Sequence, residues 1–267
     1  MTYTAIRYEV ADRVATVTLD RPDAMNAATF EMDDEMQDAV RQADADPDVG
    51  CIVLTGAGKA FCAGDDISRA WGDPRMEATL AELAGPNPPM TPFVELALGI
   101  DTPLLAAVNG VAVGSGMDIA LACDILIASE RARFGQLYAK VGLMPDTLGL
   151  WLLSQMVGRS RAAEMLMTGE IIDAVEALRI GLVSRVVPGE DLLPTAHEIA
   201  GRIAANPPQS IRHVKQGMRL AAGREQSELA EVATFVGHGL SHLFTTEDHK
   251  EAATAFAEKR EPRFTGR

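Results

Sequence analysis

Two glycine-rich stretches are the first places in this sequence where chemistry could occur. They span residues 59–67 (KAFCAGDDI) and 109–116 (NGVAVGSG), and the second opens directly into an apolar helix predicted over 115–122. The first amides of a helix lack partners within the helix, and the helix dipole adds partial positive charge, so an anion is favoured there. Glycines before helices are most often tight turns, however, so the pattern alone indicates only a candidate site.

Three side chains near the second stretch could transfer protons. Asp118 falls in the first turn of the predicted helix, Asp146 follows Pro145 at the start of the next helix, and Tyr138 follows the run Phe-Gly-Gln at 134–136. Each also has a structural interpretation: Asp118 could neutralise the helix dipole, Asp146 could be an N-cap, and Tyr138 could be a packed ring. The carboxylates are the stronger candidates, because a phenol is a poor base at neutral pH.

Several familiar functional motifs are missing from the sequence. It contains no GxSxG nucleophile elbow, no GxGxxG and no GxxxxGK[ST]. Only His238 and His242 share a helical face, and they have no neighbouring carboxylate ligand, so no metal site is predicted. The three cysteines show no CxxC spacing, which argues against a disulfide framework and favours the reducing cytoplasm.

The charge balance limits the classes of molecule that this protein is expected to bind. The chain has 24 Lys and Arg against 38 Asp and Glu, a net charge of −14, and no basic run longer than a pair, so nucleic acid is not an expected partner. The N-terminus lacks the apolar stretch of a secretory signal. The most apolar region, 104–128, is interrupted by polar residues such as Asn109 and Asp124, so no membrane span is expected.

The secondary-structure elements that must position these residues predict an α/β fold. Apolar, β-branched runs predict an opening hairpin over 3–19 and buried strands at 51–55, 104–108 and 124–128. Residues 29–45 have helical periodicity. We expect 59–67 to be a loop and the proline-containing segment 74–91 to be irregular.

Helices prevail in the C-terminal part. Helical patterns cover 147–157, 161–166 and 174–180, a last short strand is predicted at 182–187, and Pro188-Gly189 marks a plausible boundary. Four amphipathic stretches follow, at 191–205, 208–222, 225–244 and 247–260. We therefore predict a core over 1–188 and a helical subdomain over 189–267, which is too thin to be stable unless it packs on the core or on another subunit.

The residues also resemble a known family, the enoyl-CoA hydratase/isomerase or crotonase superfamily. The resemblance runs in order from about residue 5 to residue 264. The matching blocks are 59–67, 106–124 (AAVNGVAVGSGMDIALACD), 134–136, 141–146 (VGLMPD), 166–169 (LMTG), 177–187 (ALRIGLVSRVV) and 256–264 (FAEKREPRF).

This resemblance implies a ββα superhelix whose helical tail mediates trimerisation, giving a homotrimer or a dimer of trimers. It implies an acyl-CoA substrate and no separate cofactor, because coenzyme A is part of that substrate. By motif position, the backbone N–H groups of Asp65 and Ser115 would hold the thioester oxygen. The resemblance places coenzyme A along Ala63, Asp65, Asp66 and Ile67, with Phe256 and Lys259 reaching a neighbouring subunit's ligand.

The resemblance leaves the reaction open, because the acid–base groups differ from the usual pattern. Hydratases of the family carry glutamates at the positions of Asp118 and Tyr138. The position of Asp146 resembles that of the catalytic carboxylate in ring-epoxide phenylacetyl-CoA isomerases and of a shuttle carboxylate in dienoyl-CoA isomerases. We therefore expect an isomerase in which Asp146 removes a proton, Asp118 assists and the two amides hold the enolate. The alternatives are an enoyl-CoA hydratase, a non-catalytic acyl-CoA-binding or scaffolding protein, or a hydrolase or dehalogenase of the same superfamily.

Overall fold

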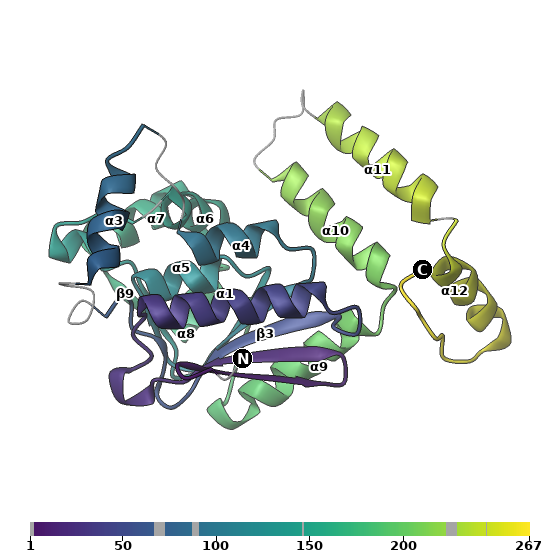
Figure 1. Cartoon of the computed structure of the whole chain (residues 1–267), viewed down its shortest axis with the longest axis horizontal. Coiled ribbons are helices and arrows are strands. Elements are labelled where there is room, and N and C mark those ends of the chain that lie inside the picture. Colours follow the sequence, from purple (N-terminus) through teal and green to yellow (C-terminus); the bar gives the residue numbers. More distant parts are fainter. Residues whose placement is uncertain (1–2, 67–72, 87–90, 146, 223–228, 244) are drawn as a thin grey trace.

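The chain folds around two β-sheets, as a computed structural model shows (Figure 1). The structure describes residues 3–66, 73–86, 91–145, 147–222, 229–243 and 245–267. The larger sheet has the strand order β1-β2-β3-β5-β7-β10, and the smaller has the order β4-β6-β8-β9. Chain segments alternate between the two sheets before entering a helix, which confirms the predicted α/β class.

The larger sheet begins with a hairpin and continues with parallel strands. Its members are β1 (Ile6–Ala11), β2 (Val14–Leu19), β3 (Cys51–Gly56), β5 (Leu104–Val108), β7 (Ile125–Ser129) and β10 (Arg185–Val187). β1 pairs with β2 antiparallel through a turn in which Asp12 and Arg13 have φ of 50° and 64°. The other pairings are parallel, so the strands need covering helices on both faces.

The larger sheet is buried on both faces, which explains its continuous apolar strands. On one face, Ile52 and Leu54 of β3 pack with Met32 and Met36 of α1 (Phe30–Ala45). On the other face, Val53 and its alternating neighbours pack against α9 (Leu192–Ala204). Alternate residues of one strand therefore enter two different hydrophobic cores.

The smaller sheet consists of four three-residue strands that carry the loops of interest. They are β4 (Ala60–Cys62), β6 (Val111–Val113), β8 (Arg133–Gly135) and β9 (Ile171–Asp173). β4, β6 and β8 are parallel and β9 is antiparallel. Because β4 and β6 are adjacent, the segments that follow them leave the sheet at the same edge.

The remaining elements are helical. They are η1 (Pro22–Ala24), α3 (Pro74–Leu83), α4 (Pro92–Gly99), α5 (Ser115–Leu121), η2 (Tyr138–Val141), α6 (Thr147–Val157), α7 (Arg159–Thr168), α8 (Ala174–Arg179), η3 (Gly189–Asp191), α10 (Pro208–Ala221), α11 (Leu229–Leu243) and α12 (Glu247–Glu258). None of the helices in the described part of the chain is long and apolar enough to cross a membrane.

The structure corrects two of the local predictions. The expected loop at 59–67 contains strand β4, and the segment expected to be irregular contains α3. Pro74 stands in the first turn of α3, where its missing N–H costs nothing, and the side chain of Asp73 caps the helix. A proline can therefore start a helix as well as interrupt one, and Pro74 starts α3.

Helix α5 lies unusually close to strand β4. A Cβ atom built on Gly116 would lie 2.2 Å from the carbonyl oxygen of Cys62, closer than any side chain tolerates. Only glycine allows the start of α5 to contact the end of β4 at this distance. This contact fixes the second glycine-rich stretch against the first.

The tail helices α10, α11 and α12 extend to one side of the main body (Figure 1). α9 packs on the larger sheet, and α10 is joined to the body by an ion pair whose lysine is buried. Lys215 Nζ lies 2.7 Å from Asp124 Oδ2 and donates to the Thr102 carbonyl at 2.9 Å. The predicted boundary near residue 189 stays a prediction, because α9 follows it and still covers the core.

The ion pair of the buried Lys215 at α10 predicts an effect on stability. Lys215→Met should lower the free energy of unfolding by about 1–3 kcal/mol, because Asp124 loses its cation but keeps the Leu104 amide. Arg179→Met, which breaks an exposed pair with Glu176, is the control and should leave stability nearly unchanged. Urea denaturation measures both, and equal effects of the two variants would contradict this role of Lys215.

The contact of Gly116 predicts a second effect. Gly116→Ala should destabilise the protein by about 1–3 kcal/mol through overpacking against β4. Gly201→Ala is the matched control, because Gly201 lies inside helix α9 and, apart from the neighbouring backbone of that helix, no described atom comes within 4 Å of the new Cβ. This change should stabilise by about 0.5–1 kcal/mol. Thermal denaturation of both variants shows whether each change raises or lowers stability. A Gly116→Ala variant with unchanged stability would show that α5 and β4 can move apart.

Candidate active site

The two glycine-rich stretches meet in the fold. Gly64 and Gly114 both have positive φ, +92° and +56°, which side chains rarely adopt. A Cβ on Gly64 would lie 3.1 Å from the Val113 carbonyl oxygen and 3.9 Å from the Ser115 amide nitrogen, and a Cβ on Gly114 would lie 3.8 Å from the Gly64 Cα. The backbone before Asp65 is therefore in direct contact with the backbone before Ser115.

The hydrogen bonds around Asp65 show which way its amide points. The amide of Ala28 donates to the Gly64 carbonyl at 2.8 Å, and the amide of Asp66 donates to the Ala28 carbonyl at 2.7 Å. Successive amides of extended backbone point to opposite sides. The Asp65 N–H is thus directed away from Ala28.

Ser115 is the first residue of α5, so its amide belongs to the turn that has no partner inside the helix. The Gly114 carbonyl accepts from Met117 and Asp118 amides at 2.9 and 3.2 Å, which closes the first turn. Within the part of the chain that the structure describes, the buried Ser115 hydroxyl has no hydrogen-bond partner either.

Two asparagines and one arginine hold the first stretch in place. The side-chain amide of Asn26 donates to the carbonyls of Ala57 and Ala60 at 2.9 and 2.8 Å, and that of Asn109 donates to Ala60 at 3.1 Å. Arg21 pairs with Asp66 at 2.8 Å, with both side chains largely buried. These contacts fix the turn before β4 and the residue after Asp65. The sequence analysis included Asn109 in the second glycine-rich stretch but predicted this role for none of the three residues.

Asp118 lies buried one turn after Ser115, with 3% of its surface exposed. Gln136 Nε2 donates to Asp118 Oδ1 at 2.5 Å, and the Tyr138 hydroxyl donates to Asp118 Oδ2 at 2.9 Å. Gln136 is fully buried, and its Oε1 has no partner among the described residues. The structure thus joins two of the three predicted acid–base residues, and adds Gln136, whose place in the motif was visible but whose contact was not.

The start of α6 closes over this carboxylate. A Cβ on Gly149 would lie 2.3 Å from Asp118 Oδ1 and 3.0 Å from Pro145 Cβ. Residue 149 must therefore be glycine for Asp118 to keep its place. Asp146, the third predicted acid–base residue, lies outside the described residues, as does Ile67.

The other residues expected to bind coenzyme A fall into two separate regions. Ala63, Asp65 and Asp66 follow β4 at the glycine contact. Phe256 lies in α12, and Lys259 directly follows that helix with a φ of 56°. The structure of one chain does not bring these two regions together.

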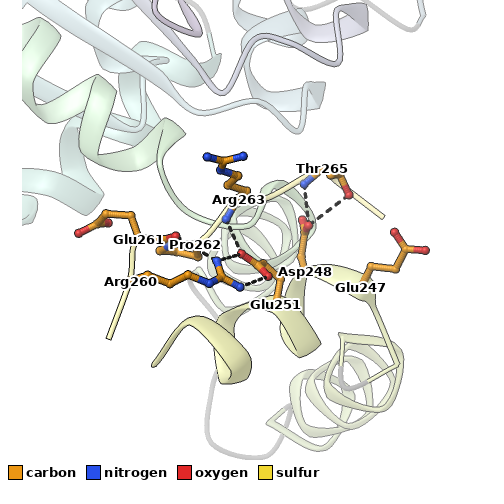
Figure 2. Close-up of a pocket in the computed structure, with 8 residues that line it drawn as sticks. All are labelled: Glu247, Asp248, Glu251, Arg260, Glu261, Pro262, Arg263 and Thr265. Carbon is orange, nitrogen blue, oxygen red and sulfur yellow. Dashed lines mark hydrogen bonds and ion pairs between the residues drawn. The ribbon is translucent and has the colours of Figure 1, made fainter. Parts of the chain in front are cut away.

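A cavity of about 830 Å³ lies in the tail and not at the glycine contact (Figure 2). It is lined by α12 and the C-terminal strand-like segment, where Asp248 accepts from the amides of Thr265 and Gly266 at 2.7 and 2.9 Å. Arg260 binds both carboxylate oxygens of Glu251. The polar lining is thus largely paired within the tail itself.

The described residues offer neither a metal cluster nor an activated thiol. No group of three or more His, Cys, Asp or Glu among them could hold a metal ion. Cys62 lies beneath the glycine contact, and burial raises the pKa of its thiol to about 12. A thiol with this pKa remains protonated and is a poor nucleophile at neutral pH.

The geometry can do one kind of chemistry well. Two backbone N–H groups near one another can stabilise an oxygen on which negative charge develops, and a buried carboxylate one helical turn away can move a proton. The arrangement suits a carbonyl compound that passes through an enolate.

Comparisons with known proteins match nearly the whole chain. The family model for enoyl-CoA hydratase/isomerase matches residues 9–267. The chain is 38% identical over 267 residues to the "Probable enoyl-CoA hydratase echA8" of Mycobacterium tuberculosis, covering 100% of both chains. It is 39% identical to the short-chain-enoyl-CoA hydratase of Clostridium acetobutylicum over 253 residues, 94% of each chain.

A solved structure extends the likeness to the fold. The enoyl-CoA hydratase of Bacillus anthracis superposes with a TM-score of 0.90 at 30% identity, covering 99% of this chain and 100% of that one. The two-sheet architecture, the converging glycine stretches and the match of the family model along nearly the whole length lead to one conclusion: this chain belongs to the enoyl-CoA hydratase/isomerase family and has the crotonase-type fold.

Proposed function

We propose that this enzyme is an enoyl-CoA hydratase, which adds water across the C2–C3 double bond of a 2-enoyl-CoA to give a 3-hydroxyacyl-CoA. The observation that carries the proposal is that one short helix, α5, supplies both the Ser115 amide at the contact with Gly64 and the buried carboxylate of Asp118. The two relatives given above are named as a probable enoyl-CoA hydratase and a short-chain-enoyl-CoA hydratase, which favours this reaction over the isomerase that the sequence led us to expect.

The two amides act on the thioester oxygen. When water attacks C3, the double bond shifts and negative charge collects on that oxygen. Backbone N–H groups of Asp65 and Ser115 that are already in place stabilise the charge without reorganising, so they lower the transition state more than the ground state. Because the donors belong to the main chain, the Asp65 side chain is not needed for this role.

Asp118 moves the proton in this proposal. Its carboxylate accepts a proton from the attacking water as the C3–O bond forms, and then returns a proton to C2 as the enolate collapses, which balances the addition of one water. The Tyr138 hydroxyl and the Gln136 amide hold the two carboxylate oxygens in one orientation. Tyr138 therefore acts on Asp118, because a phenol is not a base at neutral pH.

Coenzyme A would lie along Ala63, Asp65, Asp66 and Ile67, where small residues let the backbone approach the ligand. Phe256 and Lys259 would reach the ligand of a neighbouring subunit in a homotrimer or a dimer of trimers. Apolar side chains that the single chain leaves exposed support such an assembly. They include Met167 and Val175 on the core, at 80% and 73% exposure, and Val214 and Met218 on α10.

The reducing cytoplasm is the compartment we propose, since all three cysteines are free.

An isomerase is the second candidate, and one contact favours it. Gly149, which follows Asp146 by three residues in the sequence, lies against the Asp118 carboxylate. A second carboxylate in this part of the chain could remove a proton from one carbon while the enolate is held and allow its return at another. Both reactions suit the same fold, so the chemical identity of the product distinguishes a hydratase from an isomerase.

Substitution of Asp118 tests the hydratase. Asp118→Asn should reduce kcat for hydration of a short 2-enoyl-CoA about 10²–10⁴-fold with a small change in KM, because the amide cannot take the proton from water. Asp48→Asn, at an exposed site away from the glycine contact, is the control and should match the wild type. Loss of enoyl absorbance gives the rate, and mass spectrometry identifies the 3-hydroxyacyl-CoA. Tight binding of the thioester with no product from the wild type would instead support a scaffolding role.

Substitution of Asp146 separates the two candidates. For a hydratase that relies on Asp118, Asp146→Asn should keep hydration within roughly tenfold of wild type. In deuterated water the wild type should place deuterium at C2 of the hydrated product. A product with a shifted double bond that disappears in Asp146→Asn would contradict the hydratase proposal and establish the isomerase.

A further inference from the structure

Arg21, two residues after β2, carries a largely buried guanidinium that contacts the chain at two points near Asp65. Its Nη1 donates to the Ala27 carbonyl, and its Nη2 pairs with Asp66 Oδ2 at 2.8 Å. The main chain of Arg21 is itself fixed by the fully buried Asn26. The Arg21 amide donates to Asn26 Oδ1 at 2.8 Å, and the Asn26 amide donates to the Arg21 carbonyl at 2.9 Å. The guanidinium therefore extends from an anchored backbone.

The peptide group between Ala27 and Ala28 joins Arg21 to the next hydrogen bond. Its C=O accepts from the Arg21 guanidinium, and its N–H donates to the Gly64 carbonyl at 2.8 Å. A trans peptide group is planar, and its C=O and N–H point in opposite directions. The two hydrogen bonds therefore hold this peptide group at both ends.

The peptide group between Gly64 and Asp65 comes next, and it carries the amide that we propose binds the thioester oxygen. Its C=O accepts from the Ala28 amide, so its N–H points to the opposite side of the segment. Ala28 and Asp65 also form an isolated parallel bridge, in which the Asp66 amide donates to the Ala28 carbonyl at 2.7 Å. The guanidinium and two peptide groups thus form one row of hydrogen bonds that ends at the Asp65 N–H.

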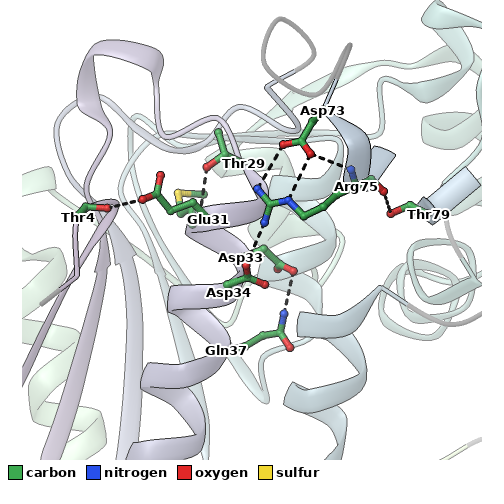
Figure 3. A network of polar contacts seen from close by, with 10 residues as sticks. Thr4, Thr29, Glu31, Asp33, Asp34, Gln37, Asp73, Arg75 and Thr79 are labelled. Carbon is green, nitrogen blue, oxygen red and sulfur yellow. Dashed lines mark hydrogen bonds and ion pairs between the residues drawn. The ribbon is translucent and has the colours of Figure 1, made fainter. Parts of the chain in front are cut away.

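Helix α1 restricts Ala28 from the other side. Thr29, the next residue, caps the helix through a hydroxyl that accepts from the Met32 amide at 3.2 Å (Figure 3). In the first turn, Glu31 accepts from the Thr4 hydroxyl at 2.9 Å, which ties the start of the helix to the chain before β1. Ala28 is therefore followed by a capped and anchored helix, which limits rotation of its peptide groups.

We propose that Arg21 is a positioning residue for the Asp65 amide, and that its guanidinium begins the row of hydrogen bonds that orients and polarises the Asp65 N–H. The role rests on the proposed function of the Asp65 and Ser115 amides. Each hydrogen bond in such a row polarises the next, so a cation at its start makes the last N–H a stronger donor. In this role Arg21 acts through the backbone, without contact with the thioester.

Acetoacetyl-CoA tests this role without turnover. It is a 3-oxoacyl-CoA whose enolate absorbs in the near ultraviolet, so the enolate fraction of the bound ligand reports on the two amides. The measurement compares wild type, Arg21→Met, the double variant Arg21→Met/Asp66→Leu and Arg7→Met at saturating ligand and neutral pH. Saturation removes any change in the affinity for coenzyme A. On the same proteins, kcat and KM are measured for hydration of a short 2-enoyl-CoA.

Arg21→Met should lower both the enolate equilibrium constant and kcat roughly 10- to 100-fold, with a small change in KM, because the Asp65 donor remains but is displaced and less polarised. Arg7→Met is the matched control. Arg7 pairs at 2.9 Å with Asp20, the residue before Arg21, and its side chain is exposed. Its loss should leave both quantities within about twofold of the wild type.

The double variant separates position from charge. Arg21→Met alone leaves the Asp66 carboxylate without this cation, and that negative charge by itself disfavours an enolate. Arg21→Met/Asp66→Leu removes both charges, and apolar replacement of both members of a buried pair usually preserves folding. The double variant should remain at least about tenfold below the wild type, because the Ala27 carbonyl still lacks its guanidinium donor. If Arg21→Met does not fold, the double variant carries the comparison.

Four results would overturn the proposal. A folded Arg21→Met with the wild-type enolate signal would show a structural role only. Recovery of the double variant to the wild-type value would show an effect of charge alone, and an equal loss in Arg7→Met would show a general effect of removing an arginine. Binding of acetoacetyl-CoA with no enolate signal in the wild type would overturn the proposed function of the two amides, and the role of Arg21 with it.

Discussion

The close contact of two backbone segments is the constraint on which the rest of this structure depends. Gly64 and Gly114 adopt positive φ at the point where the segments after β4 and β6 touch, and Gly116 lets α5 reach β4. A side chain on Gly64 or Gly116 would press on backbone atoms, which cannot move aside as a flexible side chain can, and at Gly114 the positive φ itself disfavours a side chain. The adjacency of two short parallel strands in the smaller sheet, and the asparagines that fix the turn before β4, both maintain this contact.

In the proposed function, a chain with a net charge of −14 would bind an anionic thioester because backbone amides recognise the thioester oxygen. Partial charges of the backbone are not cancelled by surface carboxylates when they point inward at short range. The same short helix carries the proposed acid–base group, since Ser115 and Asp118 are separated by about one turn. Donor and carboxylate consequently share one rigid element, and Gln136 and Tyr138 from the β8–η2 segment fix the carboxylate from the other side.

Much of the fold and part of the candidate site could be predicted from the sequence, and the predictions that were wrong or missing have physical reasons. The hairpin, α1 and the parallel strands of the larger sheet were predictable because they bury continuous or periodic apolar patterns. Strands β4, β6, β8 and β9 have three residues each, too few for a pattern to register. The contact between Gln136 and Asp118 joins residues 18 positions apart and depends on how η2 follows β8. The preference for an isomerase came from single residues at the acid–base positions, whereas the relatives that match nearly the whole chain carry the names of a probable enoyl-CoA hydratase and a short-chain-enoyl-CoA hydratase.

The central claim is that the Asp65 and Ser115 amides polarise one thioester oxygen, and the bound carbonyl itself reports on it most directly. An enoyl-CoA labelled with ¹³C at the thioester carbonyl would be examined free and bound to excess enzyme by NMR and Raman spectroscopy. The account predicts a downfield carbonyl resonance and a lower C=O stretching frequency in the bound state, both diminished when Ser115→Pro removes one N–H. A bound carbonyl with the resonance and frequency of the free ligand would contradict it.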